Sequence, residues 1–380
     1  MVVSDNAANI KAAVQTELGW KHFGCFAHSI NLVVNDGLKG EDISQIINKV
    51  KYIVGHFKRS HSATQKLLTY QQNQGTGVPL KLLQDVATRW NSTFYMLERF
   101  IALEDTVKAT MALTNMDPTS HLTTDEWVAI KQILQVLKPF EKVTKTVSGE
   151  GYLTASLVIP LANGLISVYK GFVDKPVAES EIIRNMLRRI NKSLDERFGK
   201  LENSNTLSMA TFLDPRFKSL AFKDKRYFDI TKKNVISLVA EKIAQSKQSV
   251  SEDEPMSSAC DDPTGSEDEI WADFDKEASE CQPIGSAVSK AIIEVQRYLD
   301  CDRLDRKQDP LKWWKEHKYM LPHLALVAQE RQSAIATSVP CEREFSKAGL
   351  ILTDRRSRLS STKTKMLLFL NSNRKVATLL

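Results

Sequence analysis

Two acidic residues at opposite ends of the sequence lie where carboxylates can do chemistry. Asp5 follows the predicted end of a strand, and Glu342 follows Pro340 in the predicted first turn of a helix. Carboxylates at the C-terminal tips of strands in an α/β sheet can hold two Mg²⁺ ions for phosphoryl transfer. The structural alternative is helix capping for Asp5 and a favourable interaction with the helix dipole for Glu342. Neither acid alone identifies an enzyme.

A second group of residues suits contact with nucleic acid. Arg89-Trp90-Asn91 places a base, an indole and an amide before a predicted helix, and a Trp there can stack on an unpaired base. Equally, Trp90 can be a core residue with polar neighbours. A basic cluster near the C-terminus predicts phosphate contacts or nuclear import, or simply a solvated helix end. Its arginines are Arg355, Arg356 and Arg358.

Two further motifs are open to a functional and a structural interpretation. Cys25 and His28 have C-x-x-H spacing, but a zinc site needs four ligands and no second pair follows at suitable spacing. A buried cysteine and a hydrogen-bonded histidine are therefore favoured. Trp313 and Trp314 are adjacent on a predicted helix, so their indoles point to opposite sides and both need burial in a core or an interface.

Composition limits the class of protein. Hydrophobic residues make up 42% and charged residues 26% of the 380 positions, as in globular domains, with no run of eighteen apolar residues and no secretory signal. Five irregularly spaced cysteines favour a reducing compartment, cytosol or nucleus. Residues 251–281 carry twelve acids and one base, so of the net charge of +6 this segment holds −11 and the remainder +17. A body that basic favours a polyanionic partner, with nucleic acid first.

The elements that must position these side chains are mostly helices. Strands are predicted for residues 1–3 and for Trp20–Phe26, with Gly19 as the C-cap of the helix between them. Ala210–Phe217 is predicted as a break, and the acidic residues 249–284 as a disordered linker. The predicted helices cover Asn6–Leu18, Ala27–Phe57, Thr93–Thr114, Thr124–Val147, Glu181–Phe198, Lys232–Gln248 and Val288–Leu299.

Five motifs in order along the chain resemble those of the hAT superfamily of transposases, most closely its BED zinc-finger type. They are Asp5-Asn6-Ala7-Ala8-Asn9, Cys25 to Leu32, Thr88 to Ser92, Asp309 to Trp314, and Ser338 to Gly349 followed by Arg355 to Leu359. The resemblance implies a mainly α fold with a partial α/β RNase H-like catalytic core interrupted by a long helical insertion. It divides the chain into a partial core (1–110), the insertion (111–248), the acidic linker (249–284) and a C-terminal dimerisation region that returns to the core (285–380).

The resemblance also implies residue roles. Asp5 matches the second catalytic Asp and Glu342 the catalytic Glu, both as Mg²⁺ ligands, while Trp90 matches the residue that stabilises a flipped base. Cys25 and His28 match a motif that flanks the active site. DNA contacts are expected from Arg89, Trp90, Arg355, Arg356 and Arg358. Dimer contacts are expected from Trp313, Trp314, Phe345, Leu367 and Leu370.

The family's first Asp and its BED finger would fall before Met1, so the sequence predicts an N-terminally truncated member. Mg²⁺ is the cofactor of a complete member, and none is expected for this chain alone. We expect a nuclear, non-catalytic protein derived from a transposase, with DNA and further copies of itself as partners and with no membrane or small-molecule substrate. The alternatives are a fragment of an active DNA-cleaving and joining transposase, and a helical scaffold without a DNA role.

Overall fold

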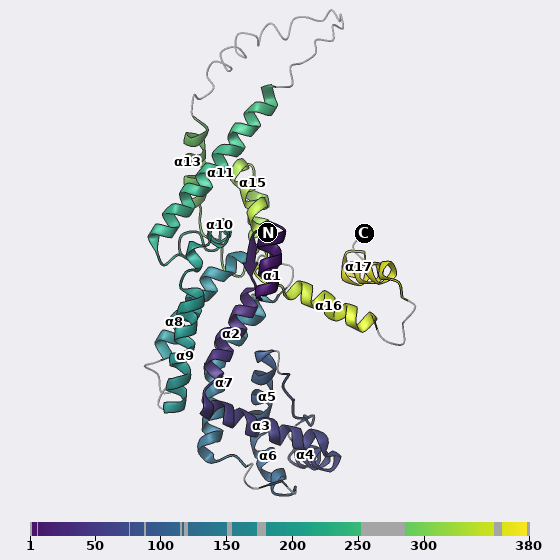
Figure 1. Cartoon of the computed structure of the whole chain (residues 1–380). Coiled ribbons are helices and arrows are strands. Elements are labelled where there is room, and N and C mark those ends of the chain that lie inside the picture. Colours follow the sequence, from purple (N-terminus) through teal and green to yellow (C-terminus); the bar gives the residue numbers. More distant parts are fainter. Residues whose placement is uncertain are drawn as a thin grey trace, which may run out of the picture. The chain divides into compact units, whose positions relative to one another are not determined.

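The computed structural model describes residues 2–5, 7–75, 77–86, 89–114, 116–117, 121–149, 154–172, 180–251, 286–352 and 359–377. The chain forms two compact units, which are described separately below (Figure 1). Unit 1 comprises Met1–Leu201 and Ile335–Leu380, and unit 2 comprises Glu202–Ala334. The boundaries predicted at residues 110 and 248 lie inside these units. The predicted linker falls almost wholly in 252–285, outside the described residues.

The only sheet among the described residues is small and lies at the start of unit 1. Strands β1 (Val2–Ser4) and β2 (His22–Gly24) pair in parallel, with Val2 opposite His22 and Ser4 opposite Gly24. The crossover between them is helical, as parallel strands require. Gly19 ends it with φ of +61°, a left-handed conformation that glycine adopts without steric cost. Both predicted strands are present, although the second is shorter than predicted, and the predicted helix is divided into an α-helical and a π-helical part. Gly19 follows Leu18, the C-cap residue of the π-helical part.

The remainder of unit 1 is a helical body, so the prediction of a mainly α fold is confirmed. Its helices are α1 (Ala8–Ala12), the π-helix η1 (Ala13–Glu17), α2 (Phe26–Leu38), α3 (Glu41–Arg59), α4 (His61–Asn73), α5 (Trp90–Ala102), α6 (Glu104–Met111), α7 (Thr124–Val147), the 3-10 turn η3 (Ala155–Leu157), α8 (Val158–Phe172), α9 (Glu181–Phe198), α16 (Val339–Ile351) and α17 (Ser361–Ala377). Helices α2, α8 and α9 pack together, as do α5 and α7.

Two periodic patterns gave correct helix boundaries. Helices α7 and α9 begin and end where the sequence predicts. Thr123 starts α7 with a capping box, in which its hydroxyl accepts from the Glu126 amide and the Glu126 carboxylate accepts from the Thr123 amide. Aromatic packing joins α7 to its neighbours, with Phe100 and Trp127 stacked at 4.9 Å between ring centroids.

Several predicted boundaries were wrong. The helix predicted for Lys232–Gln248 extends from Lys225 to Ser251. The pattern from Ala27 to Phe57 is divided into α2 and α3, with Gly40 as the N-cap of α3. The helix predicted for Thr93–Thr114 is divided at Leu103 into α5 and α6. Residues 210–212, predicted as a break, form the end of α10 in unit 2. In each case the apolar residues keep a helical spacing along the sequence, and tertiary packing decides where the helix ends.

Helix α8 is unusually apolar but packs as a core helix. The window Ala155–Phe172 is long and apolar enough to cross a membrane by length and composition alone, and half of it is buried. Its Tyr169 is fully buried, its hydroxyl donates to the Val136 carbonyl, and its ring stacks on Phe140. We therefore interpret α8 as a core helix of unit 1, whose apolar side chains pack inside the protein.

Unit 2 has its own aromatic core. Its helices are α10 (Asn205–Phe212), α11 (Lys225–Ser251), α13 (Ala287–Asp300), α14 (Pro310–His317) and α15 (Pro322–Gln332), after the 3-10 turn η5 (Leu201–Asn203). Trp313 and Trp314 are 7% and 6% exposed and pack against Tyr298. The Trp314 indole donates to the Leu213 carbonyl at 3.0 Å. Both indoles thus serve the core of unit 2 and present little surface for a dimer contact.

A close approach of helices α2 and α9 in unit 1 depends on a glycine. A Cβ atom at Gly37 of α2 would lie 2.6 Å from Cγ1 of Ile190 on α9. We expect Gly37→Ala to lower the free energy of unfolding by about 1–3 kcal/mol through overpacking, measured by urea denaturation. Gly164→Ala on α8 is the matched control, because nothing lies within 4 Å of its Cβ position. There we expect a gain of about 0.5–1 kcal/mol from helix propensity. Equal effects of both would contradict close packing at Gly37.

Candidate functional site

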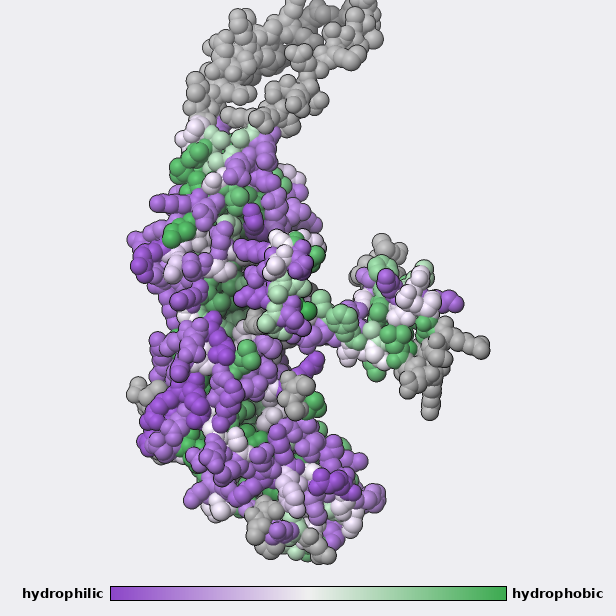
Figure 2. Space-filling model, viewed as in Figure 1, coloured by the Kyte–Doolittle hydropathy of each residue, from purple (hydrophilic) through white to green (hydrophobic). Residues whose placement is uncertain are grey.

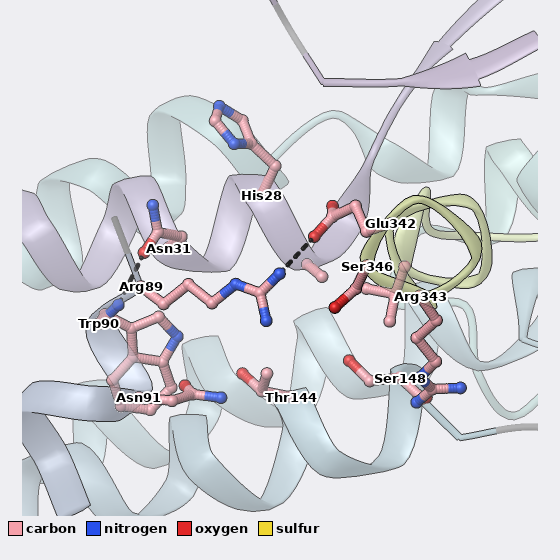
Figure 3. Close-up of a pocket in the computed structure, with 12 residues that line it drawn as sticks. His28, Asn31, Arg89, Trp90, Asn91, Thr144, Ser148, Glu342, Arg343 and Ser346 are labelled. Atoms are coloured by element: carbon pink, nitrogen blue, oxygen red, sulfur yellow. Dashed lines mark hydrogen bonds and ion pairs between the residues drawn. The ribbon is translucent and has the colours of Figure 1, made fainter. Parts of the chain in front are cut away.

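A cavity of about 600 Å³ in unit 1 gathers residues from four helices and from the turns beside them (Figure 3). This size is typical of sites that hold a small ligand or a single nucleotide group. The lining residues are Ala27, His28 and Asn31 of α2, Arg89, Trp90 and Asn91 at the start of α5, Thr144 and Ser148 at the end of α7, and Val339, Glu342, Arg343 and Ser346 of α16. The cavity therefore unites residues from both ends of the chain.

Backbone contacts around Cys25 connect these distant segments. The Cys25 amide donates to the Ser4 carbonyl at 2.7 Å. This hydrogen bond connects the last residue of β1 to the residue that precedes α2. The Cys25 thiol, 1% exposed, accepts from the Ser338 amide at 3.3 Å. The amide of Phe26 donates to the Ala336 carbonyl at 2.9 Å. Cys25, predicted to be buried, thus connects the end of β1, the start of α2 and the start of α16 by hydrogen bonds.

Glu342 faces the cavity in an ion pair. Its carboxylate lies 3.2 Å from the Arg89 guanidinium (Figure 3). It also accepts from the Ser338 hydroxyl at 3.1 Å. Both side chains are well exposed, Arg89 at 71% and Glu342 at 48%, so the pair contributes little to stability. The adjacent Arg343 donates to the Ser148 carbonyl. Arg89, Arg343 and Glu342 thus all line this cavity, and its two arginines suit an anionic ligand.

The Arg89-Trp90-Asn91 motif is held by α2 and by its own turn. The Trp90 amide donates to the Asn31 side chain at 3.2 Å, and the Ser92 hydroxyl accepts from the Val86 amide at 2.8 Å. Trp90 is only 4% exposed, and its ring packs edge to face against Phe94 and Phe140. The faces of the indole are thus largely occupied by the core, as the structural interpretation of this residue expects. Arg89 and Asn91 are the members of the motif that offer polar groups to the cavity.

Two buried polar atoms of the cavity wall have no hydrogen-bond partner. They are Oδ1 of Asn91 and Oγ1 of Thr144, two of the three such side-chain atoms among the described residues. Sequence reasoning did not single out Thr144, although a signal was present. Thr144 follows Leu137 and Phe140 along the buried face of α7, where a polar residue is unexpected. Buried polar groups are nearly always paired, so unpaired ones require an explanation.

The surroundings of Thr144 are charged as well as polar. Glu141, one turn earlier on α7, accepts from the Tyr95 hydroxyl at 3.1 Å and pairs with Lys145. Burial raises the pKa of the Glu141 carboxyl, but the hydrogen bonds from Lys145 and Tyr95 outweigh this effect and hold the pKa below its ordinary value. Glu141 therefore stays ionised at neutral pH, and its negative charge is compensated.

Asp5 lies at the tip of β1, where the sequence predicts it. Its carboxylate accepts from the Ala7 amide at 3.4 Å, while the N-cap position of α1 is Ala7 itself. Asp5 is exposed and is absent from the described residues that line the cavity. A Mg²⁺ pair would need converging carboxylates, and no group of three His, Cys, Asp or Glu residues occurs in the described part of the chain. These donors do not fit a two-metal centre, and we derive no metal-dependent step.

The other predicted site residues have different fates. His28 lines the cavity, as expected of a residue that flanks the site (Figure 3). Arg355, Arg356 and Arg358 lie outside the described residues. Of the residues predicted for self-association, the exposed ones are Phe345 on α16 and Leu367 and Leu370 on α17.

Helices α16 and α17 expose large apolar side chains among the described residues (Figure 2). They pack on each other, and Ser372 of α17 donates to the Glu344 carboxylate of α16 at 2.6 Å. The large apolar side chains point elsewhere. This surface, here called the C-terminal apolar surface, consists of Phe345, Leu350, Leu352, Met366, Leu367, Phe369 and Leu370, which are 40–77% exposed. Contiguous apolar surface of this kind is typical of a protein interface.

Comparisons with known proteins agree with this architecture. Residues 23–136 match the ZBED1 RNase-like helical domain, and residues 294–374 match the hAT family C-terminal dimerisation region. The chain is 25% identical over 380 residues to human Zinc finger BED domain-containing protein 4. This alignment covers 98% of the chain and 31% of that protein. It is 27% identical over 362 residues to the “Putative AC transposase” of Zea mays, covering 90% and 42% respectively.

A third relative, human Zinc finger BED domain-containing protein 6, is 32% identical over 232 residues, covering 57% of this chain and 22% of that protein. The chain thus spans less than half the length of each of these three relatives. The two domain matches, one on the helical body of unit 1 and one ending in α17, cover regions that the motifs had associated with the same family. The chain is therefore a hAT-family transposase-like protein, related both to BED zinc-finger proteins and to AC transposases.

Proposed function

We propose that this chain is a nuclear, transposase-derived protein that binds DNA through the cavity surface of unit 1 and self-associates through α16 and α17, without cleaving DNA itself. The DNA part of the proposal rests on the presence of two arginines, Arg89 and Arg343, in the lining of a cavity of nucleotide size. The charge of +17 outside the acidic segment supports it, because a basic body attracts the phosphate backbone. The self-association part rests on the C-terminal apolar surface and on the matched dimerisation region.

DNA binding is tested by its dependence on salt. Arg89→Gln is expected to weaken binding of short duplex or single-stranded DNA by a few fold and to reduce the slope of log K against log salt by about one. Fluorescence anisotropy with labelled DNA measures both. Arg99→Gln is the matched control, because Arg99 lies on the same helix α5 but donates to the Lys81 carbonyl. If the unmutated chain shows no salt-dependent binding at low ionic strength, the proposed DNA role is wrong and the scaffold alternative stands.

The alternative of a fragment of an active transposase is favoured by one observation. The contacts of Cys25 link the end of β1, next to Asp5, to the start of α16, one turn before Glu342. Glu342→Gln distinguishes the two functions. A non-catalytic protein should bind DNA more tightly with this variant, because a negative charge beside Arg89 is removed. An active enzyme should instead cleave transposon-end DNA with Mg²⁺ and lose that cleavage in the variant.

A further inference from the structure

A further cavity, which the proposed function does not use, lies in unit 2 and has an arginine-rich lining. It measures about 440 Å³ and is lined by two loops, the first with Arg216 and Phe217 and the second with Arg303, Leu304, Asp305 and Arg306. We propose that this cavity binds a phosphate group, either as free phosphate or as part of a nucleic acid backbone. The inference concerns unit 2 alone and does not depend on the cavity of unit 1.

The two loops are joined by hydrogen bonds. The Leu304 amide donates to the Pro215 carbonyl at 3.1 Å. The Lys218 ammonium donates to the carbonyls of Tyr298 and Cys301 at 2.7 Å and 2.6 Å. Lys218 has a φ of +48°, a conformation that is uncommon for residues other than glycine and persists where surrounding contacts enforce it. The positions of the two loops are therefore fixed before a ligand binds, which lowers the conformational cost of binding.

Arg216 is the buried arginine of the lining, and its orientation is fixed. It is 9% exposed, and its guanidinium binds the Asp214 carboxylate at 2.9 Å from Nε and 2.6 Å from Nη2. The ring of Phe217 lies 5.1 Å from its Cζ atom. Nη1 is the guanidinium nitrogen that Asp214 does not engage. A guanidinium held in one orientation is well suited to donate to a bound anion.

Arg303 and Arg306 supply the excess charge of the cavity. Both are exposed, and neither side chain has a partner among the residues that the structure describes. Asp305 lies between them in sequence, and its carboxylate accepts from the Lys307 amide at 2.8 Å, which stabilises the turn. Three arginines set against the carboxylates of Asp214 and Asp305 leave one positive charge in excess. The cavity therefore favours an anion.

A phosphate group suits these donors better than a carboxylate does. Arginine presents its N–H groups in a planar fork that matches the oxygens of a phosphate, and such charge-assisted bonds are among the strongest in proteins. A tetrahedral phosphate has enough oxygens to accept from all three guanidinium groups, whereas a carboxylate has two. The single negative charge of a phosphodiester also equals the excess positive charge of the cavity.

The first arm of the test measures DNA binding by the full chain. Arg303→Gln together with Arg306→Gln should weaken binding of a labelled short duplex on the order of tenfold. The slope of log K against log salt should fall by about two, because two phosphate contacts are lost. Fluorescence anisotropy measures both quantities. Arg303→Lys together with Arg306→Lys keeps the charge, so the slope should be retained while the loss of the planar forks still weakens binding.

Arg297→Gln together with Arg331→Gln is the matched control. These arginines are also exposed in unit 2, but they are not part of the cavity lining. The control removes the same charge and should change the salt slope clearly less than the cavity variant does. Because all four arginines are exposed, the thermal midpoint should be unchanged in both double variants.

The second arm uses inorganic phosphate alone, at constant ionic strength and with chloride as the reference salt. Phosphate should slow hydrogen exchange of peptides from 214–218 and 301–308 in the unmutated chain, and not in the Arg303→Gln, Arg306→Gln variant. Slowed exchange would identify free phosphate as a ligand of the cavity. A salt slope reduced only in the cavity variant, without slowed exchange, would identify phosphate held in a nucleic acid backbone.

Equal salt slopes for the two double variants, together with unchanged exchange, would overturn the phosphate site. The proposed DNA function would survive that result, because it depends on unit 1 and is tested by Arg89→Gln. If the unmutated chain bound no DNA, the proposed DNA function would fail, and the exchange experiment would still decide whether this cavity binds phosphate.

Discussion

A chain that carries Leu367→Glu and Leu370→Glu is expected to sediment as a monomer at concentrations where the unmutated chain is a dimer. The two leucines are 40% and 64% exposed on α17, and burial of this remaining surface against a second copy would stabilise the dimer by about 0.6–2 kcal/mol for each leucine in each copy. A carboxylate at either position would also have to be desolvated. The dissociation constant should therefore rise by more than roughly a hundredfold. Sedimentation equilibrium of the full chain measures it.

The geometry of α17 supplies the control for this prediction. At 3.6 residues per turn, Lys365 lies on the opposite side of the helix from Leu370, and it is exposed. Lys365→Glu changes the charge of α17 by the same amount as the double variant, so it separates an effect of charge from the loss of the two leucines. We expect this variant to remain dimeric. A monomeric mass for both the unmutated and the doubly substituted chain would contradict self-association through α17.

The polar contacts between α16 and α17 explain why the apolar surface points outward. Lys347 and Ser372 both reach the Glu344 carboxylate, so the face that joins the helices is partly polar. Thr364, 7% exposed, lies on the same inner side of α17. A surface helix usually turns its apolar residues toward its own core. The reverse arrangement here is the one that an interface with a second copy of the chain would require.

Helix period explains which parts of the fold could be predicted. In α7 and α9 the apolar residues repeat regularly over 24 and 18 residues, and the predicted boundaries are correct. Such long amphipathic patterns leave little choice of structure. The division between α5 and α6 at Leu103 leaves no mark in the sequence, because the apolar spacing continues through it. Local conformation there is decided by packing with other helices.

The candidate site was less predictable because it depends on contacts between distant residues. Arg89 and Glu342 are separated by 253 positions in the sequence. Their pairing depends on the contacts of Cys25, which hold the start of α16 beside α2. The motif around Trp90 was visible in the sequence, but whether the indole is buried or exposed was not. The unpaired state of Thr144 is invisible in any sequence, since it is defined by the absence of a donor in the folded chain.

The largest expected loss of stability is in unit 2, at a buried ion pair. Asp214 is 0% exposed, and its carboxylate accepts from Arg216 at 2.9 Å from Nε and 2.6 Å from Nη2. Arg216 is itself only 9% exposed. Asp214→Asn would leave this guanidinium buried without its counter-charge, so we expect the free energy of unfolding to fall by about 3–5 kcal/mol. Removing one partner of a buried ion pair destabilises the fold strongly, because the remaining charge stays desolvated without a counter-charge. This loss is far larger than the stability that the intact pair adds over two apolar residues in the same place.

A second Asp-x-Arg pair in unit 2 provides the matched control. Asp224 binds Arg226 with the same bidentate contact, Nη2 lying 2.6 Å from Oδ2, but the Arg226 side chain is 85% exposed. Water screens this pair, so Asp224→Asn should cost less than about 1 kcal/mol. Hydrogen exchange of peptides from α13 and α15 measures the stability of unit 2 separately from unit 1. Asp214→Asn should accelerate exchange there far more than Asp224→Asn. Equal acceleration would mean that burial of the Asp214–Arg216 pair does not affect stability. The core around Trp314 and Tyr298 would then not depend on this pair.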